Sequence, residues 1–253
     1  MLNFYNRLSA KVYDMDKYIG RSFGDVEYYC ERLSDCKGVI LEPGVGTGRM
    51  LIPLLEQGLQ VEGFDLSTEM LDICRKNCEQ RGLVPNLFTG KMEDFSLKKE
   101  YEAIIVPTGT FLLLHQREKS IQALKNFYHH LADGGTLFID IFLQTDLTIG
   151  KVSTKTWELD DGDIITLETK IVEVDYINQY TISHHRYEKW RNGELILTEL
   201  ERFPLRWYGI EEFKVLLERI GFGDIILSAD YQFGEYPTDP KQMVTFEARA
   251  HKK

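Results

Sequence analysis

The chain has 253 residues, 43% of them hydrophobic, which is enough to bury a sizeable core within one elaborated domain. Its formal net charge of -10 argues against nucleic acid and against anionic membranes as partners. No apolar stretch approaches the roughly 20 residues that cross a bilayer, and the first residues lack the apolar centre of a signal peptide, so we expect a cytoplasmic protein.

The first half of the chain carries the pattern of a parallel sheet. Short apolar runs alternate with amphipathic helical patterns between Val39 and Phe142, which is typical of a sheet covered by helices on both faces. Ser67 is expected to N-cap a helix over residues 68–81. Strands are predicted over residues 39–42, 60–65, 86–90, 102–107 and 136–142.

The pattern changes to period-2 alternation from Trp157 to about Tyr208, with hairpin signals at Asp161-Gly162 and Asn192-Gly193. A helical pattern then returns, stops at Gly221, and precedes two more strand candidates over residues 224–233 and 243–250. The fold class we expect is α/β, with a Rossmann-like, doubly wound, mostly parallel sheet, an antiparallel final strand and an inserted antiparallel β-layer.

Four cysteines are too few in a chain of this length to indicate a disulfide framework, so we expect reduced thiols. Cys74 and Cys78 share one face of a predicted helix with Met70, but no further cysteine or histidine stands at ligand spacing. We therefore expect core thiols and no metal site.

The stretch "LEPGVGTGRM", residues 41–50, follows a predicted strand and opens a helix. Its glycines let backbone N–H groups approach a ligand at the positive end of the helix dipole. A phosphate-binding P-loop is excluded, because Arg49 and Met50 stand where it needs Lys and then Ser or Thr. The dinucleotide fingerprint is weakened, because Arg49 replaces its third glycine.

The pattern E-x-G-x-G-x-G from Glu42 to Gly48 resembles the class I S-adenosylmethionine-dependent methyltransferase family, and the resemblance extends to "VEGFDLS", "GKMEDF", "EAIIVPTGTF" and "LADGGTLFIDIF". It implies that Asp65 binds the cofactor ribose, that Asp94 meets the adenine amine, and that the fourth strand ends beneath the methionine moiety. The cofactor-binding residues that it implies are Tyr13, Arg21, Glu42, Gly44, Gly46, Gly48, Asp65, Leu66, Met70, Met92, Glu93, Asp94 and Pro107.

We expect one methyltransferase domain over residues 1–253. The resemblance implies an N-terminal lid over residues 1–37 and a cofactor-binding core over 38–142, whereas the change of pattern predicts a β insertion over 143–208 and a C-terminal part over 209–253 that completes the sheet. In the lid, Tyr13 and Tyr18 would face the sulfonium or the substrate, and Arg21 would pair with the cofactor carboxylate. Core packing is the competing interpretation of the aromatic residues.

Structural interpretations compete with each cofactor assignment. In these interpretations the glycine turn serves only packing, Asp65 only caps a helix, and Asp94 is only exposed to solvent. All the matched segments follow strands, and open α/β sheets bind ligands at the carboxyl ends of their strands. The joint spacing of these segments therefore favours cofactor binding over the structural interpretations. Tyr13 and His115 are the candidate catalytic residues; for His115 the alternative is an exposed residue at the start of a helix.

The resemblance implies methyl transfer from S-adenosylmethionine to a nitrogen or oxygen nucleophile of a small-molecule acceptor, leaving S-adenosylhomocysteine. The fourth strand ends in "VPTGT" and lacks the signatures of DNA methyltransferases. An NAD-dependent oxidoreductase and a catalytically silent cofactor-binding module remain as alternatives. We expect a monomer or a homodimer, with no nucleic acid and no membrane as partner.

The insertion is expected to roof the acceptor pocket, because it follows the fifth strand at the edge where the cofactor would bind. The rival interpretation is a dimer interface. The aromatic and polar side chains it offers are Trp157, Tyr180, His184, His185, Tyr187, Trp190 and Trp207.

Overall fold

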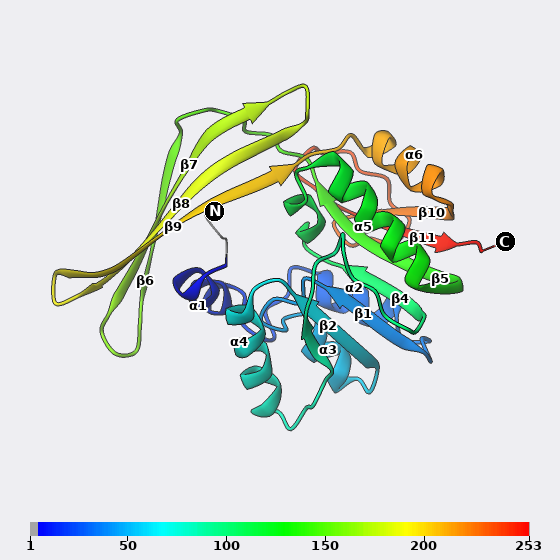
Figure 1. Cartoon of the computed structure of the whole chain (residues 1–253), viewed down its shortest axis with the longest axis horizontal. Coiled ribbons are helices and arrows are strands. Elements are labelled where there is room, and N and C mark those ends of the chain that lie inside the picture. Colours follow the sequence, from blue (N-terminus) through cyan, green and yellow to red (C-terminus); the bar gives the residue numbers. More distant parts are fainter. Residues whose placement is uncertain (1–4, 253) are drawn as a thin grey trace.

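The computed structural model describes residues 5–252, and its centre is a seven-stranded sheet in the order β10-β11-β5-β4-β1-β2-β3 (Figure 1). Strands β1 to β5 pair in parallel, whereas β11 is antiparallel to both β5 and β10. The expected mostly parallel sheet with an antiparallel final strand is confirmed. The strands span Val39–Pro43 (β1), Gln60–Asp65 (β2), Leu87–Thr89 (β3), Tyr101–Val106 (β4), Leu131–Phe142 (β5), Phe222–Ala229 (β10) and Met243–Ala250 (β11).

Helices cover both faces of this sheet. In β4, Ile104 and Val106 pack in one core cluster with α5 and α6, whereas Ala103 and Ile105 pack in the other with α2, α3 and α4. Successive side chains of a strand point to opposite faces, so a nearly all-apolar strand supplies both layers. The helices span Arg7–Asp16 (α1), Asp25–Arg32 (α2), Leu51–Glu56 (α3), Thr68–Glu79 (α4), Arg117–His130 (α5) and Ile210–Ile220 (α6), with a 3₁₀ turn at Thr110–Leu113 (η1).

Helix α4 begins as the sequence predicts. The Ser67 hydroxyl accepts a hydrogen bond from the Met70 N–H at 3.1 Å, which satisfies one of the free donors at the helix start. Met70, Cys74 and Cys78 are all buried, and the cysteines are free thiols, as expected of core residues. The helix ends at Glu79, two residues before the predicted end at residue 81.

The insertion forms a second, four-stranded antiparallel sheet that projects from the core as an arm (Figure 1). Its last hairpin pairs Arg191 with Glu194 across the predicted Asn192-Gly193 turn. The prediction missed the first strand almost entirely, because residues 152–156 are all exposed and show no alternation. The strands span Val152–Glu158 (β6), Ile164–Asp175 (β7), Tyr180–Arg191 (β8) and Glu194–Arg206 (β9).

Helix α1 joins the arm to the core. Leu8 and Val12 pack against Ile165 and other apolar residues of the arm in a third buried cluster. At the start of the helix, Glu201 of β9 accepts hydrogen bonds from the Asn6 N–H at 2.9 Å and from the Ser9 hydroxyl at 2.5 Å. A carboxylate from another element thus satisfies orphan donors at the positive end of the helix. Among the helices of residues 5–252, none combines the length and apolarity needed to cross a membrane.

Candidate functional site

The glycine loop between β1 and α3 lies at the carboxyl end of the sheet. The first two backbone N–H groups of the loop are already hydrogen-bonded within the protein, because those of Gly44 and Val45 both donate to the Phe64 carbonyl, at 2.7 and 3.0 Å. A Cβ at Gly44, which has φ 76°, would stand 2.6 Å from the Thr110 methyl group. A Cβ at Gly48 would stand 2.9 Å from the Cys74 sulfur. Packing therefore requires glycine at both positions, whatever the loop binds.

Asp65, the last residue of β2, connects the glycine loop to the start of α4. Its carboxylate accepts from the Gly46 N–H and from the Ser67 N–H, each at 2.9 Å. Burial raises the pKa of Asp65, and these backbone donors oppose the rise. The two oxygens accept these bonds from different N–H groups, so the carboxylate keeps acceptor capacity for a ligand hydroxyl. Asp65 thus supports the helix start and also faces the glycine loop.

Arg49 forms a buried ion pair that the sequence pattern does not reveal. Its guanidinium binds the Asp25 carboxylate through both terminal nitrogens, one of them at 3.1 Å, and donates to the Arg21 carbonyl at 3.1 Å. The bidentate pair ties the segment after the glycine loop to helix α2. A long buried side chain therefore occupies the position where a dinucleotide-binding loop has its third glycine.

Glu42 is a buried acidic residue with an unused acceptor. The residue is only 2% exposed, and its Oε2 atom has no hydrogen-bond partner within residues 5–252. Burial raises the pKa of Glu42 far above its usual range, although the charge of Arg49 opposes the rise. An unpaired buried carboxylate oxygen is costly, so a donor from a bound ligand would stabilise the site.

The N-terminal segment, which was predicted to form a lid, places one of its candidate residues over the loop. The Tyr13 ring lies opposite Gly46, 3.7 Å from where a Cβ of that residue would stand, and burial raises the pKa of Tyr13 to about 12. Tyr18 is 56% exposed. The Arg21 guanidinium is also exposed and donates to the Asp16 carbonyl. Of these three residues, Tyr13 is therefore the one that lies over the glycine loop.

The remaining predicted residues follow β2, β3 and β4 at the same edge of the sheet. The Met92 methyl group would meet a Cβ at Gly44 at 3.0 Å, so Met92 borders the loop. Glu93 pairs with Lys119 of α5 at 3.4 Å, and Asp94 is exposed. Met70 is buried in the first turn of α4, whereas Leu66 is 53% exposed and Pro107 directly follows β4.

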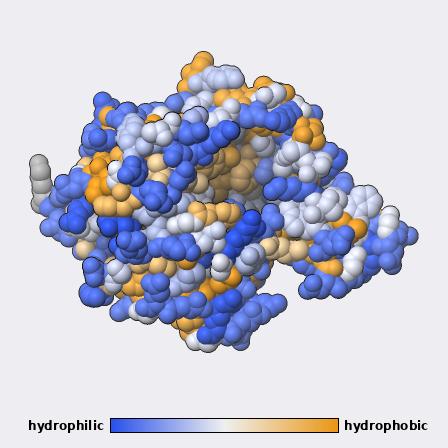
Figure 2. Space-filling view, turned by 180° about the vertical axis from the view of Figure 1, so that it is seen from behind, coloured by the Kyte–Doolittle hydropathy of each residue, from blue (hydrophilic) through white to orange (hydrophobic). Residues whose placement is uncertain are grey.

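A cavity of about 530 Å³ lies beside the carboxyl ends of β4 and β5. Hydrophobic side chains line a hollow near the middle of the face shown in Figure 2. None of the residues lining the cavity was among the predicted site residues, because they come from segments far apart in the chain. They are Lys17, Phe23, Thr108, Phe142, Leu143, Thr145, Asp230, Tyr231, Lys241 and Met243.

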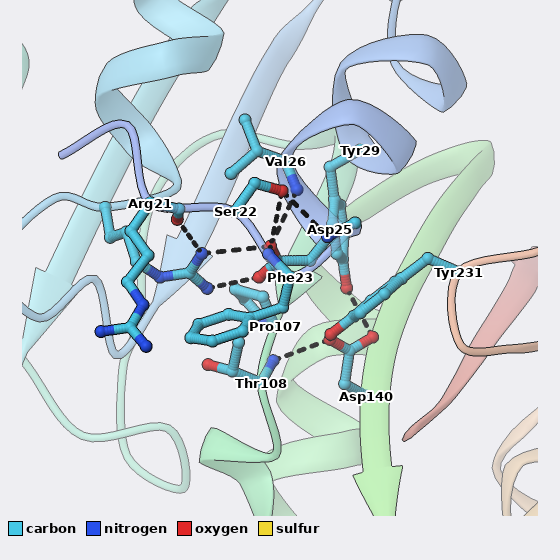
Figure 3. A network of polar contacts seen from close by, with 12 residues as sticks. Arg21, Ser22, Phe23, Asp25, Val26, Tyr29, Pro107, Thr108, Asp140 and Tyr231 are labelled. Carbon is cyan, nitrogen blue, oxygen red and sulfur yellow. Dashed lines mark hydrogen bonds and ion pairs between the residues drawn. The ribbon is translucent and has the colours of Figure 1, made fainter. Parts of the chain in front are cut away.

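Asp140 of β5 stands directly behind this cavity. Its carboxylate is fully buried and accepts from the Thr245 hydroxyl at 2.7 Å, the Thr108 N–H at 2.7 Å, the Tyr29 hydroxyl at 2.9 Å and the Tyr231 hydroxyl at 3.1 Å (Figure 3). Burial raises the pKa of Asp140 to about 6, and the donors oppose the rise.

Thr108 has φ 54°, a strained conformation for a β-branched residue, and its N–H is held by Asp140. The carboxylate thus fixes two cavity walls, Thr108 and Tyr231. Its sequence signal was an aspartate inside the apolar run "LFIDIF".

The arm does not roof this cavity, contrary to the sequence expectation. The cavity residues that belong to the insertion, Leu143 and Thr145, precede β6. Tyr187 packs in the cluster around α1, and the His185 ring stacks on Phe203 with centroids 4.5 Å apart. The arm therefore covers α1, and it approaches the glycine loop through that helix.

His115 also faces the arm, with its ring 5.4 Å from the Tyr180 ring. It does not line the cavity. Burial lowers the pKa of His115, and the charge of Arg202 lowers it further, so the ring is neutral near pH 7.

Comparisons with known proteins agree with this geometry. Residues 40–135 match a family of methyltransferase domains. YqeM of Bacillus subtilis, which is named as a methyltransferase, is 25% identical over 217 residues, which make up 85% of each chain. The glycine/sarcosine N-methyltransferase of Aphanothece halophytica is 26% identical over 225 residues, covering 87% of this chain and 80% of that enzyme.

The fold agrees as well. The structure of S-adenosylmethionine-bound CalS10, an amino pentose methyltransferase from Micromonospora echinaspora, has a TM-score of 0.69 at 18% identity and covers 99% of both chains. The glycine loop and Asp65 lie at the carboxyl ends of neighbouring parallel strands, as the sequence resemblance implies. Residues 40–135 thus carry a methyltransferase domain, and the relatives and the fold support a class I S-adenosylmethionine-dependent methyltransferase.

Proposed function

We propose that this enzyme methylates an amine nitrogen of a small molecule bound in the cavity beside β4 and β5. The observation that carries the proposal is the cavity itself, whose volume of about 530 Å³ suits a small ligand and whose walls combine apolar side chains with polar and charged ones. Two similar proteins have names that specify amine acceptors, glycine or sarcosine in one and an amino pentose in the other. The predicted oxygen nucleophile is the second candidate.

The residues at the glycine loop fit the cofactor. In the proposed arrangement the Asp65 carboxylate binds the ribose hydroxyls with its remaining acceptor capacity, and the unpaired Glu42 oxygen accepts from the ammonium group. Tyr13 covers the loop, while Met92 and Asp94 lie on the adenine side. Leu66, Met70, Glu93 and Pro107 border the same edge, and Arg21 reaches the carboxylate only if it releases the Asp16 carbonyl.

The cofactor supplies an activated methyl group, so the protein must mainly align a neutral amine with it. Thr108 and Tyr231 are suited to this task, because the buried Asp140 carboxylate holds both in place. His115 is neutral near pH 7 and able to accept a proton. Because its ring lies beside Tyr180 and outside the cavity, it would serve as a base only for an acceptor that extends towards Tyr180.

The other predicted functions differ in what they require of this site. NAD binding would require a close approach of helix and pyrophosphate at the position that the buried Arg49 fills. A catalytically silent module would bind the cofactor without turnover. We propose that the enzyme acts in the cytoplasm, in keeping with its four free cysteines.

A turnover screen tests the proposed function. Production of S-adenosylhomocysteine is followed with paired acceptors that differ only in the nucleophile, such as glycine against glycolate and glucosamine against glucose. We expect turnover with amines and none with their hydroxyl partners. Turnover with the hydroxyl partners alone would assign the enzyme to oxygen methylation, and cofactor binding without turnover over a broad panel would support the silent module.

A further inference from the structure

The cavity beside β4 and β5 presents two lysines that come from opposite ends of the chain. Lys17 follows α1 in the N-terminal lid, and Lys241 lies just before β11. Both side chains line the same cavity, so a ligand within it lies between one cation from the lid and one from the C-terminal part of the sheet.

The charge of Lys17 is poorly compensated. Its ammonium group forms no ion pair within residues 5–252, and it lies 5.0 Å from the centroid of the Tyr13 ring. Asp25 is already engaged by Arg49 through a bidentate pair. Burial lowers the pKa of Lys17, and the positive charge of Arg49 lowers it further, whereas Asp25 and Asp16 oppose the shift. An anion at this position would relieve the cost of the half-buried charge.

Lys241 has a free side chain as well. Its backbone N–H donates to Asp239 at 2.8 Å, but its ammonium group joins no ion pair in the described part of the chain. The lining also contains Asp230, whose carboxylate accepts from the Met243 N–H at 3.0 Å and pairs with neither lysine. Two lysines and one aspartate give the lining a formal charge of +1, in a chain whose net charge is -10.

The other cavity walls strengthen this local positive charge. Phe23, Phe142, Leu143 and Met243 are apolar, and electrostatic attraction is stronger beside low-dielectric walls than in open water. We propose that the methyl acceptor carries an anionic group, a carboxylate or a phosphate, which Lys17 and Lys241 bind. This inference rests on the proposed function, because it takes the cavity as the acceptor site. The carboxylate of the cofactor is the other possible anion at Lys17.

Paired probes test the inference. Calorimetric titration of the protein saturated with S-adenosylhomocysteine compares β-alanine with β-alaninamide, and O-phosphoethanolamine with ethanolamine. We expect the anionic member of each pair to bind at least about tenfold more tightly, which corresponds to roughly 1.4 kcal/mol. Equal binding of the anionic and neutral members would overturn the inference.

Two lysine variants locate the anion. Lys17→Met and Lys241→Met should each weaken β-alanine or O-phosphoethanolamine binding by about five- to twentyfold, the range of a charge-assisted contact, and leave S-adenosylhomocysteine affinity unchanged. Lys11→Met is the matched control, because Lys11 is exposed on α1 and does not line the cavity. If Lys17→Met weakens S-adenosylhomocysteine binding and spares the probes, the anion at Lys17 is the cofactor carboxylate and the inference is wrong.

The two proposals fail in distinguishable ways. If the protein prefers anionic probes but methylates only hydroxyl acceptors, amine methylation is refuted and the anion site stands. Methylation of amines irrespective of their charge, with no effect of Lys17→Met or Lys241→Met, would keep the proposed function and refute the anion site.

Discussion

Asp140→Ala is expected to lower the free energy of unfolding by about 2 to 4 kcal/mol at pH 7, the range for buried polar groups that lose their partner. The substitution removes the acceptor of hydrogen bonds from Tyr29, Thr108, Tyr231 and Thr245, of which Tyr29 and Thr245 are fully buried. It also frees Thr108 from the contact that holds its strained backbone. Urea unfolding followed by circular dichroism measures the loss.

The loss of unfolding free energy in Asp140→Ala should depend on pH. A carboxyl pKa raised to about 6 in the native state means that the folded protein holds this proton more tightly than the unfolded chain. The contribution of Asp140 is therefore largest in acid and declines as the pH rises towards 6. The difference between wild type and Asp140→Ala should be larger at pH 5 than at pH 7.

Asp133→Ala is the matched control for Asp140→Ala. Asp133 is exposed and accepts one backbone bond, from the Lys252 N–H at 3.0 Å, so its replacement should change stability by less than about 0.5 kcal/mol. If Asp140→Ala behaves like this control, the buried network does not hold the cavity walls.

Asp65→Ala should weaken the binding of S-adenosylhomocysteine by roughly 1.5 to 3 kcal/mol, or about 10- to 150-fold, the scale for hydrogen bonds to a charged group. The variant loses the proposed ribose contact, and it also loses the bond that positions the Gly46 N–H. Calorimetric titration gives the affinity, and circular dichroism establishes that the variant is folded.

Two further variants separate the roles of Asp65. Ser67→Ala removes the cap of α4 and leaves the Asp65 carboxylate in place, so cofactor affinity should persist. Asp72→Ala alters an exposed carboxylate of α4 that pairs with Arg75, and it should have no effect on binding. Affinity that falls with Ser67→Ala and not with Asp65→Ala would show that Asp65 merely supports the helix start.

The sequence predicted most of the fold, because local periodicity determines which face of each element is buried. The nearly all-apolar β4 and the alternating β8 follow directly from such patterns. β6 was missed because its residues at 152–156 are exposed and pair only as an edge strand. β5 begins at Leu131, five residues before the strand predicted over residues 136–142.

The candidate site was predicted only where its residues are close in sequence. Glu42, Gly44, Gly46 and Gly48 form one loop, and Asp65 ends the next strand, so their spacing alone brings them together. The cavity walls and the Asp140 network join residues from α2, the β4 loop and β11, and no local pattern encodes such contacts. The Arg49 pair with Asp25 was hidden for the same reason.

Binding of S-adenosylhomocysteine and NAD to the wild-type protein, compared in one calorimetric experiment, tests the central claim most directly. The site at Glu42, the glycine loop and Asp65 predicts saturable binding of S-adenosylhomocysteine at one site per chain and no heat from NAD. Binding of NAD with no response to S-adenosylhomocysteine would contradict the assignment of this loop to a methyltransferase cofactor.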